Sequence, residues 1–173
     1  ITVSGAITNF VGNFTTAFTP QIIKTYASGN KQYSFMLANR GTKYTCLLMY
    51  YFLVPVFLES HIILKLWLGT PPEYAAIFLR FALFESMAII FGSILLKVIQ
   101  ATGNIKRYEI EVTLYGFLVF PITWICFKVG LPVWTSCLSF IIVYFSLIFI
   151  ELKTLKRLTG YPILSFFSDV VLR

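Results

Sequence analysis

Charge is the first property that this sequence has little of. Only 12% of its 173 residues are charged, and 7 residues are acidic. A soluble domain carries roughly 25% charged residues, because its surface has to interact with water. The hydrophobic share is 58%, above the roughly 45–50% of a soluble domain. This composition argues against a soluble globular domain and predicts an integral membrane protein.

Residues that bind metals or carry out catalysis are also scarce. The chain has one histidine and no Cys-x-x-Cys pair, and its three cysteines lie within apolar runs, at Cys46, Cys126 and Cys137. Structural zinc sites and redox dithiols need such pairs. The sequence shows no nucleophile beside a base and no glycine-rich phosphate loop. We therefore expect no enzymatic activity, no metal site and no bound cofactor.

Long apolar segments are what the sequence has in abundance. Each is close to the roughly 20 residues that cross a bilayer as a helix. Turn-forming groups at 27–30, 69–72 and 102–104 separate neighbouring segments. We predict an all-α membrane protein with about five transmembrane helices, forming one domain over residues 1–173. The predicted spans cover residues 2–23, 44–68, 74–99, 110–127 and 133–152.

Basic residues alternate between the predicted loops. The regions after the first, third and fifth segments are rich in lysine and arginine, whereas those after the second and fourth hold only Lys65 and Lys128. Cytoplasmic loops are the basic ones in membrane proteins. We predict that the first segment runs inward and that the C-terminal end of this multi-pass protein is cytoplasmic. The net charge of +7 is assigned to this loop bias and not to nucleic-acid binding.

The first segment carries a polar face without charge. On a helix, Asn9, Asn13 and Thr16 fall on one half with several glycines and threonines, and Phe10 and Phe14 fall on the other. Amide and hydroxyl groups are costly in lipid, so this face has to meet protein or water. Close helix–helix packing is one explanation. We favour a helix that lines an aqueous cavity, because the polar residues extend along the whole segment.

The third segment contains two charged residues within the apolar run. Glu85 lies about 16 Å from Tyr74 along the helix, near mid-membrane, where a carboxylate is a functional candidate. A protonated or paired structural glutamate is the alternative. Gln100 lies on the same side, whereas Arg80 lies on the opposite face and should not pair with Glu85. The predicted substrate- or cavity-lining residues are Asn9, Asn13, Thr16, Arg80, Glu85 and Gln100.

Three stretches of the chain resemble motifs of one known family. They are PQIIKTYASGN at 20–30, ILKLWLG at 63–69 followed by PEYA at 72–75, and QATGNIKRY at 100–108. Their order and spacing resemble those of bacterial polysaccharide flippases, the translocases of O-antigen-type lipid-linked oligosaccharides. This family belongs to the superfamily of multidrug, oligosaccharidyl-lipid and polysaccharide exporters. The resemblance covers nearly the whole chain.

The resemblance implies two six-helix lobes around a central cavity, with this chain forming part of the C-terminal lobe. It implies that undecaprenyl-diphosphate-linked oligosaccharide crosses the bacterial inner membrane by alternating access, for polysaccharide, O-antigen and lipopolysaccharide biosynthesis. The partners would be this substrate, membrane lipid and the N-terminal lobe of the same protein. The start at Ile1, without a methionine, leads us to expect a piece of a longer chain. Cavities of this family are often cationic, and here only Arg80 and Lys97 are candidates for that charge.

Three other functions are alternatives. A cation-coupled multidrug exporter would use Glu85 to couple H⁺ or Na⁺ movement to transport. A membrane enzyme such as a polysaccharide polymerase would need a large loop with charged catalytic residues, and the predicted loops are short. A membrane scaffold without transport activity would not need the polar face of the first segment.

Overall fold

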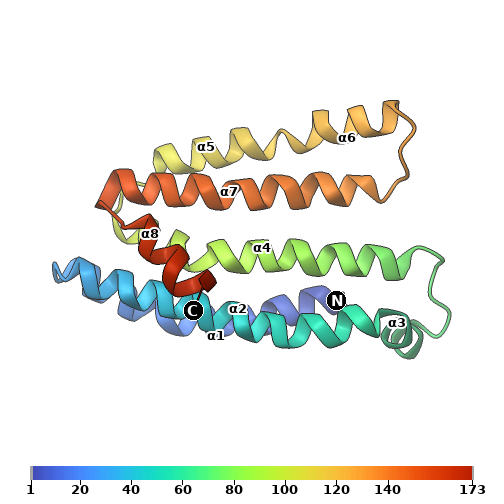
Figure 1. The fold of residues 1–173 in the computed structure, drawn as a ribbon, viewed down its shortest axis with the longest axis horizontal. Helices are drawn as coiled ribbons and strands as arrows, with labels where there is room; N and C mark the ends of the chain where they lie inside the picture. Colours follow the sequence, from blue (N-terminus) through green and yellow to red (C-terminus); the bar gives the residue numbers. More distant parts are fainter. Residues whose placement is uncertain (1, 173) are drawn as a thin grey trace.

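The computed structural model describes residues 2–172, and all its regular elements in that range are helical (Figure 1). The elements are α1 (Val3–Ala27), α2 (Lys31–Leu58), α3 (Ser60–Leu68), α4 (Ala75–Ala101), α5 (Lys106–Gly116), α6 (Val119–Lys128), α7 (Thr135–Thr159), α8 (Ile163–Phe166) and the π-helix η1 (Phe167–Leu172).

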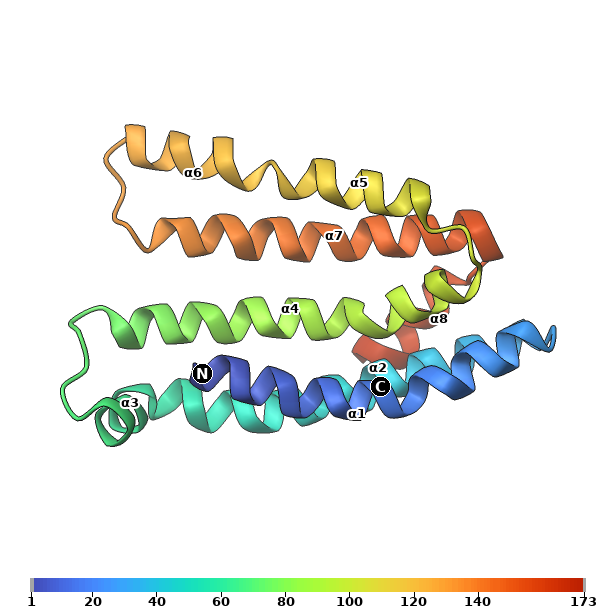
Figure 2. The same cartoon turned by 180° about the vertical axis from the view of Figure 1, so that it is seen from behind.

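The long helices lie side by side with their axes nearly parallel. Helix α4 lies between α7 on one side and the α1–α2 pair on the other, and α5 and α6 lie on the far side of α7 (Figures 1 and 2). Helices α5 and α6 therefore depend mainly on α7 for their packing, whereas α4 contacts α1, α2 and α7.

Four helical stretches within residues 2–172 are long and apolar enough to cross a membrane: α2, α4, the α5–α6 pair and α7. This confirms the predicted all-α membrane fold. At 25 residues, α1 also has the length of a span, but it is not among these four. Its asparagine and threonine side chains lower its hydropathy, so the number of five spans is approximate.

The first two predicted segments are longer than expected at the end where they meet. Helix α1 continues to Ala27 and α2 begins at Lys31, so most of the predicted basic loop before residue 44 is helical. The short turn is stabilised by Asn30, whose side chain accepts a hydrogen bond from the backbone N–H of Tyr33. The α1–α2 hairpin extends beyond the neighbouring end of α4 (Figure 2).

The predicted second and fourth segments are each divided into two helices. The 44–68 segment changes direction at Glu59, four residues after Pro55, and α3 turns aside from the axis of α2 (Figure 1). The 110–127 segment is interrupted between Gly116 and Val119, because Pro121 has no N–H to donate to the carbonyl of Phe117. Both prolines lie beside an interruption of their segment.

The C-terminal residues fold back on the α1–α2 side of the molecule. Asn39 of α2 accepts a hydrogen bond from the Tyr161 hydroxyl, and its amide donates to Asp169 at 3.3 Å. Tyr161 and Phe166 are buried in a core cluster that includes Ile94 and Leu155 of α4 and α7. This cluster fixes the ends of α2, α4 and α7 relative to one another.

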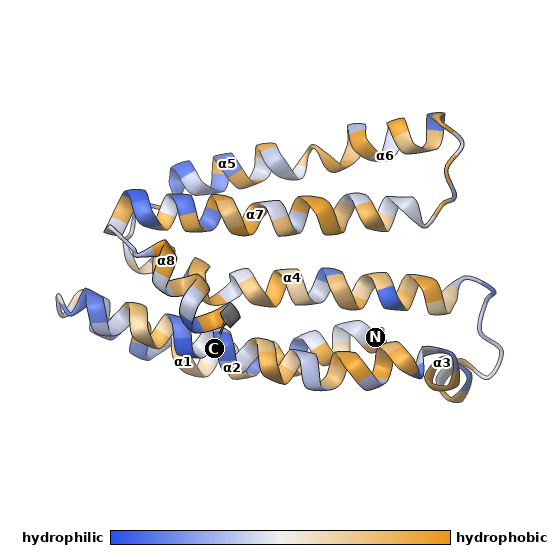
Figure 3. Cartoon of the chain, in the orientation of Figure 1, coloured by the Kyte–Doolittle hydropathy of each residue, from blue (hydrophilic) through white to orange (hydrophobic). Residues whose placement is uncertain are grey.

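Hydrophilic residues gather at one end of the helices. In Figure 3 they lie at the α1–α2 turn, the start of α5 and the end of α7, whereas the middle of α4, α6 and α7 is mostly hydrophobic. The three basic regions of the sequence therefore lie at the same end. Several apolar helices that alternate in direction are compatible with a multi-pass membrane protein. The membrane side of this end stays a prediction.

Candidate functional site

The polar half of α1 is divided between packing and exposure. Ser4 and Thr15 are buried on the same stripe as Val11, where α1 packs against α2 and α4. Asn9 and Asn13 are exposed on another part of the helix, as is Thr16. Small polar residues thus allow close packing on one stripe, and amide side chains face outward on the next.

The exposed amides of α1 have no side-chain partner within residues 2–172. Neither the Asn9 nor the Asn13 side chain makes a hydrogen bond, and the Thr16 hydroxyl donates to the backbone carbonyl of Asn13 at 2.7 Å. Phe10 lies beside these residues on the helix surface. Its side chain is 58% exposed and packs edge-on against Phe52. The exposed strip therefore offers hydrogen-bonding groups to water or to a polar ligand. That it lines a cavity stays a prediction.

Lysine extends this exposed strip toward the basic end of α1. Positions 9, 13, 20 and 24 lie on one side of a helix, because their spacings are close to whole numbers of helical turns. Asn9, Asn13, Pro20 and Lys24 are all exposed there. The strip is thus uncharged over its first half and ends in a cation.

Glu85 lies on the side of α4 that faces α7. Its side chain is half-buried near Cys137 of α7, and no hydrogen bond or ion pair to its carboxyl group is found in the described part of the chain. Glu85 and Arg80 form no ion pair with each other, as expected from their positions on opposite faces of α4. A carboxyl group between two helices, as Glu85 is between α4 and α7, can carry a proton or attract a cation.

Arg80 joins α4 to the corner between α2 and α3. Its Nε donates to the backbone carbonyl of Phe57 at 3.2 Å and to the Ser60 hydroxyl at 2.9 Å, and its guanidinium lies 5.2 Å from the centre of the Phe57 ring. These contacts hold the α2–α3 corner. The predicted lining role of Arg80 therefore has a structural role beside it.

Gln100 is exposed near the end of α4 and accepts a hydrogen bond from Lys97 at 3.4 Å. It lies 20 residues from Arg80 on the same helix, a separation of about 30 Å. The six predicted residues therefore do not form one cluster. The three on α1 share an exposed strip, whereas Arg80, Glu85 and Gln100 are spread along α4.

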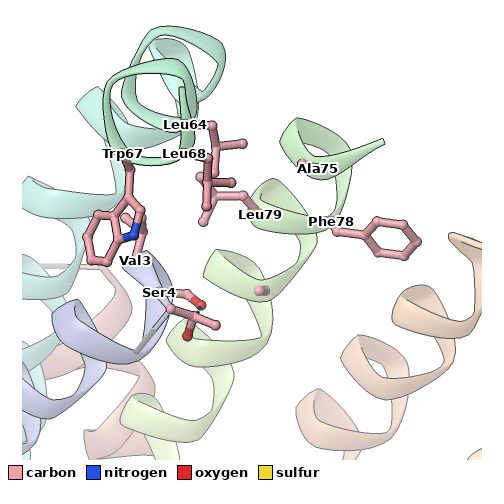
Figure 4. A pocket seen from close by; sticks show the side chains of 10 residues that line it. Val3, Ser4, Leu64, Trp67, Leu68, Ala75, Phe78 and Leu79 are labelled. Carbon is pink, nitrogen blue, oxygen red and sulfur yellow. Dashed lines mark hydrogen bonds between the residues drawn. The ribbon is translucent and has the colours of Figure 1, made fainter. Parts of the chain in front are cut away.

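An apolar pocket of about 350 Å³ lies beyond the start of α1, between α3 and α4 (Figure 4). Leu64 and Leu68 of α3 meet Leu79 of α4 there, and Trp67 lies at its side. The polar groups on its wall come from Thr2, Ser4 and the indole of Trp67, and no charged residue lines it. Such a lining suits an apolar ligand and provides no catalytic groups.

The sequence reasoning missed a buried carboxyl group at Glu151. This residue lies at the end of an apolar run, two residues before Lys153, where an acidic residue resembles a boundary charge. In the structure Glu151 is 8% exposed and accepts a hydrogen bond from Tyr108 at 2.8 Å. Only the packing of α4 and α5 on α7 reveals its burial.

No protein-family model, no curated protein and no solved structure matches this chain.

Proposed function

We propose that this chain is part of the C-terminal lobe of a bacterial flippase for undecaprenyl-diphosphate-linked oligosaccharide. The observation that carries the proposal is the exposed strip of Asn9, Asn13 and Thr16 on a helix whose other side is packed within the lobe. Lipid would leave these amides without hydrogen bonds, so a water-filled cavity is the environment that suits them.

The chemistry of the strip fits a glycan attached to a diphosphate. Sugar hydroxyls donate and accept hydrogen bonds, as do the amide groups of Asn9 and Asn13. Lys24 lies at the basic end of the same strip, where its ammonium group suits a phosphate. The glycan would lie along the amides while the diphosphate stays near this cation.

The proposal needs a second lobe to close the cavity. The exposed strip of α1 would face the N-terminal lobe of the same protein, and the two lobes would rock around the substrate in alternating access. The basic end would be cytoplasmic, in the inner membrane. Membrane lipid would surround α5 and α6, whose exposed Phe120 and Trp124 are 70% and 61% accessible.

Cation-coupled extrusion of toxic compounds is a second candidate function. It is favoured by Glu85, a half-buried carboxyl group on the side of α4 that faces α7, which has no hydrogen bond or ion pair to the residues that the structure describes. An exporter would use this group to exchange H⁺ or Na⁺, and a Glu85→Gln variant would then lose transport while the protein is still produced.

Surface display of polysaccharide in a bacterium that lacks its own flippase tests the first proposal. We expect the complete protein containing this chain to restore display. The double variant Asn9→Leu/Asn13→Leu should reduce display about tenfold, since losing two hydrogen bonds costs roughly 1–3 kcal/mol. The control Phe120→Leu, on the predicted lipid face, should display normally.

Two outcomes would count against the flippase. One is a membrane-inserted protein that restores no display for any polysaccharide tested. The other is drug efflux that is lost in Glu85→Gln and unchanged in the double asparagine variant, which would favour the exporter.

A further inference from the structure

A buried carboxyl group joins three helices at the basic end of the molecule. Glu151 of α7 is 8% exposed, and its Oε1 accepts a hydrogen bond from the Tyr108 hydroxyl of α5 at 2.8 Å. Its second oxygen, Oε2, is buried and has no hydrogen-bond partner. One oxygen is therefore held by Tyr108, and the other is buried without a hydrogen bond.

Helix α4 leaves space for this group by having glycine opposite it. A Cβ atom at Gly92 would lie 3.0 Å from Cδ of Glu151 and closer still to Oε2. The carboxyl group thus occupies the position that a side chain on α4 would otherwise fill. Glu151 is built into the α4–α7 contact and is not a boundary charge that happens to point inward.

A cavity of about 210 Å³ is lined in part by Glu151. It lies between α4, α5 and α7, and its polar lining comes from Ser93, Tyr108, Tyr144 and Glu151. The remaining lining is aliphatic. Oε2 itself is fully covered by the packing of α4 against α7, so a proton reaches it only when this packing opens.

The charges around Glu151 do not neutralise it. Helix α4 lines the cavity beside Glu151 with Ala88, Ile89, Gly92, Ser93 and Leu96, none of them charged, and Tyr144 lies on α7 itself. From α5 come Tyr108 and two more acidic groups, Glu109 and Glu111.

Two arginines of α5 and α7 are paired with a different carboxyl group, and Lys153, two residues from Glu151, forms no ion pair with it. Glu111 binds Arg107 at 2.9 Å and Arg157 at 3.3 Å, and these are the only ion pairs between residues 2 and 172. An ionised carboxylate that is buried without a cation is costly. No lysine or arginine between residues 2 and 172 forms an ion pair with Glu151, so a bound proton is what would remove this charge.

We propose that Glu151 is a reversible proton-binding site. A single carboxylate balances one positive charge, and the few hydroxyl oxygens around it fall short of the ligand shell that a divalent ion needs. The proton would bind at Oε2, which has no other hydrogen-bond partner, while Tyr108 holds Oε1. If the chain is a flippase as proposed above, this proton is the one whose movement is coupled to transport, so that last step rests on the proposed function.

Infrared difference spectroscopy of the detergent-purified chain tests the site without any transport assay. Between low and high pH, the wild-type protein should show the reversible loss of one protonated-carboxyl C=O band that Glu151→Gln lacks. The matched control Glu85→Gln should keep this band. Circular dichroism checks that each variant retains its helices.

Tyr108→Phe provides a second variant that keeps the carboxyl group. The band should remain but move in frequency, because the hydrogen bond to Oε1 is lost. Identical titrating bands in wild type and Glu151→Gln would overturn the proposal. So would a band that sodium chloride displaces at constant pH, which would indicate a sodium site, or a band in Tyr108→Phe at the wild-type frequency. A failed polysaccharide assay with a titrating Glu151 would refute the flippase alone.

Discussion

Gly92 and Glu151 show how single residues position the inner groups of this lobe. Glycine on α4 is needed because the carboxyl group of α7 occupies the adjacent space. By contrast, Gly12 of α1 has no atom within 4 Å of the position of a Cβ. Substitution by alanine is therefore expected to affect stability in opposite ways at Gly92 and at Gly12.

We predict that Gly92→Ala lowers the free energy of unfolding by about 1 kcal/mol. Overpacking costs roughly 1–3 kcal/mol, and the better helix propensity of alanine offsets about 1 kcal/mol of it. Gly12→Ala should leave stability unchanged or raise it by up to about 1 kcal/mol. Unfolding of both variants in mixed detergent measures the difference, and equal effects would contradict the close contact with Glu151.

Tyr161 makes stability depend on pH at the C-terminal end. Burial raises the pKa of its phenol above the usual value, with the Asp169 carboxylate as a second cause. The folded state therefore favours the neutral phenol. This contribution is complete below pH about 10, the pKa in the unfolded chain, and is lost as the pH rises above it.

We predict that the wild-type protein loses more stability than Tyr161→Phe between pH about 9 and 11. At neutral pH the variant should be about 1 kcal/mol less stable, because the hydrogen bond to Asn39 is lost. Free energies of unfolding across this pH range test the prediction. Parallel curves for the two proteins would show that the phenol is not held neutral.

Single residues also show what sequence reasoning could reach and what it could not. The outward position of Asn9 and Asn13 follows from helical periodicity, since both lie on the polar half. The division of that half was not predictable, because Ser4 and Thr15 are buried only through the packing of α2 and α4. Glu151 was missed for the same reason: its partners are 43 residues away at Tyr108 and on a third helix at Gly92.

The corner between α2 and α3 is an element that depends on a contact from α4. Arg80 donates to the Phe57 carbonyl and to the buried Ser60 hydroxyl there. Without the Arg80 guanidinium, the Phe57 carbonyl and the Ser60 hydroxyl would lose their charged hydrogen-bond donor. Hydrogen bonds from charged groups contribute about 1.5–3 kcal/mol.

Arg80→Met should therefore accelerate hydrogen exchange in α3 and lower stability by about 2 kcal/mol. The control Lys65→Met, which removes an exposed charge from α3, should leave exchange unchanged. Exchange that is unaffected by Arg80→Met, together with lost transport, would assign Arg80 to the substrate and not to the corner.

Helix boundaries were only partly predictable from the sequence. Pro55 and Pro121 lie next to interruptions of their segments, whereas Pro20 lies within the uninterrupted α1. The extension of α2 back to Lys31 was not expected, because basic residues near 31–43 resemble a loop in a hydropathy profile. These residues form helix beyond the apolar part of the span.

In the whole molecule, α1 packs against α2 and α4 on one side and exposes its polar strip on the other. Hydrophilic residues gather at one end of the helices (Figure 3). Exposure alone does not distinguish water from lipid, since Asn13 and Phe120 are both exposed. Their chemistry does: an amide suits a water-filled cavity and a phenylalanine suits hydrocarbon. The central claim is that the strip on α1 faces water.

Single-cysteine labelling of the complete protein in intact membranes tests that claim most directly. In a background without Cys46, Cys126 and Cys137, a water-soluble maleimide should react with Asn13→Cys and leave Phe120→Cys unlabelled, because lipid excludes the reagent. Denaturation in sodium dodecyl sulfate should make both positions reactive, which shows that both thiols are intact. An Asn13→Cys thiol as unreactive in the membrane as Phe120→Cys would contradict an aqueous cavity beside α1.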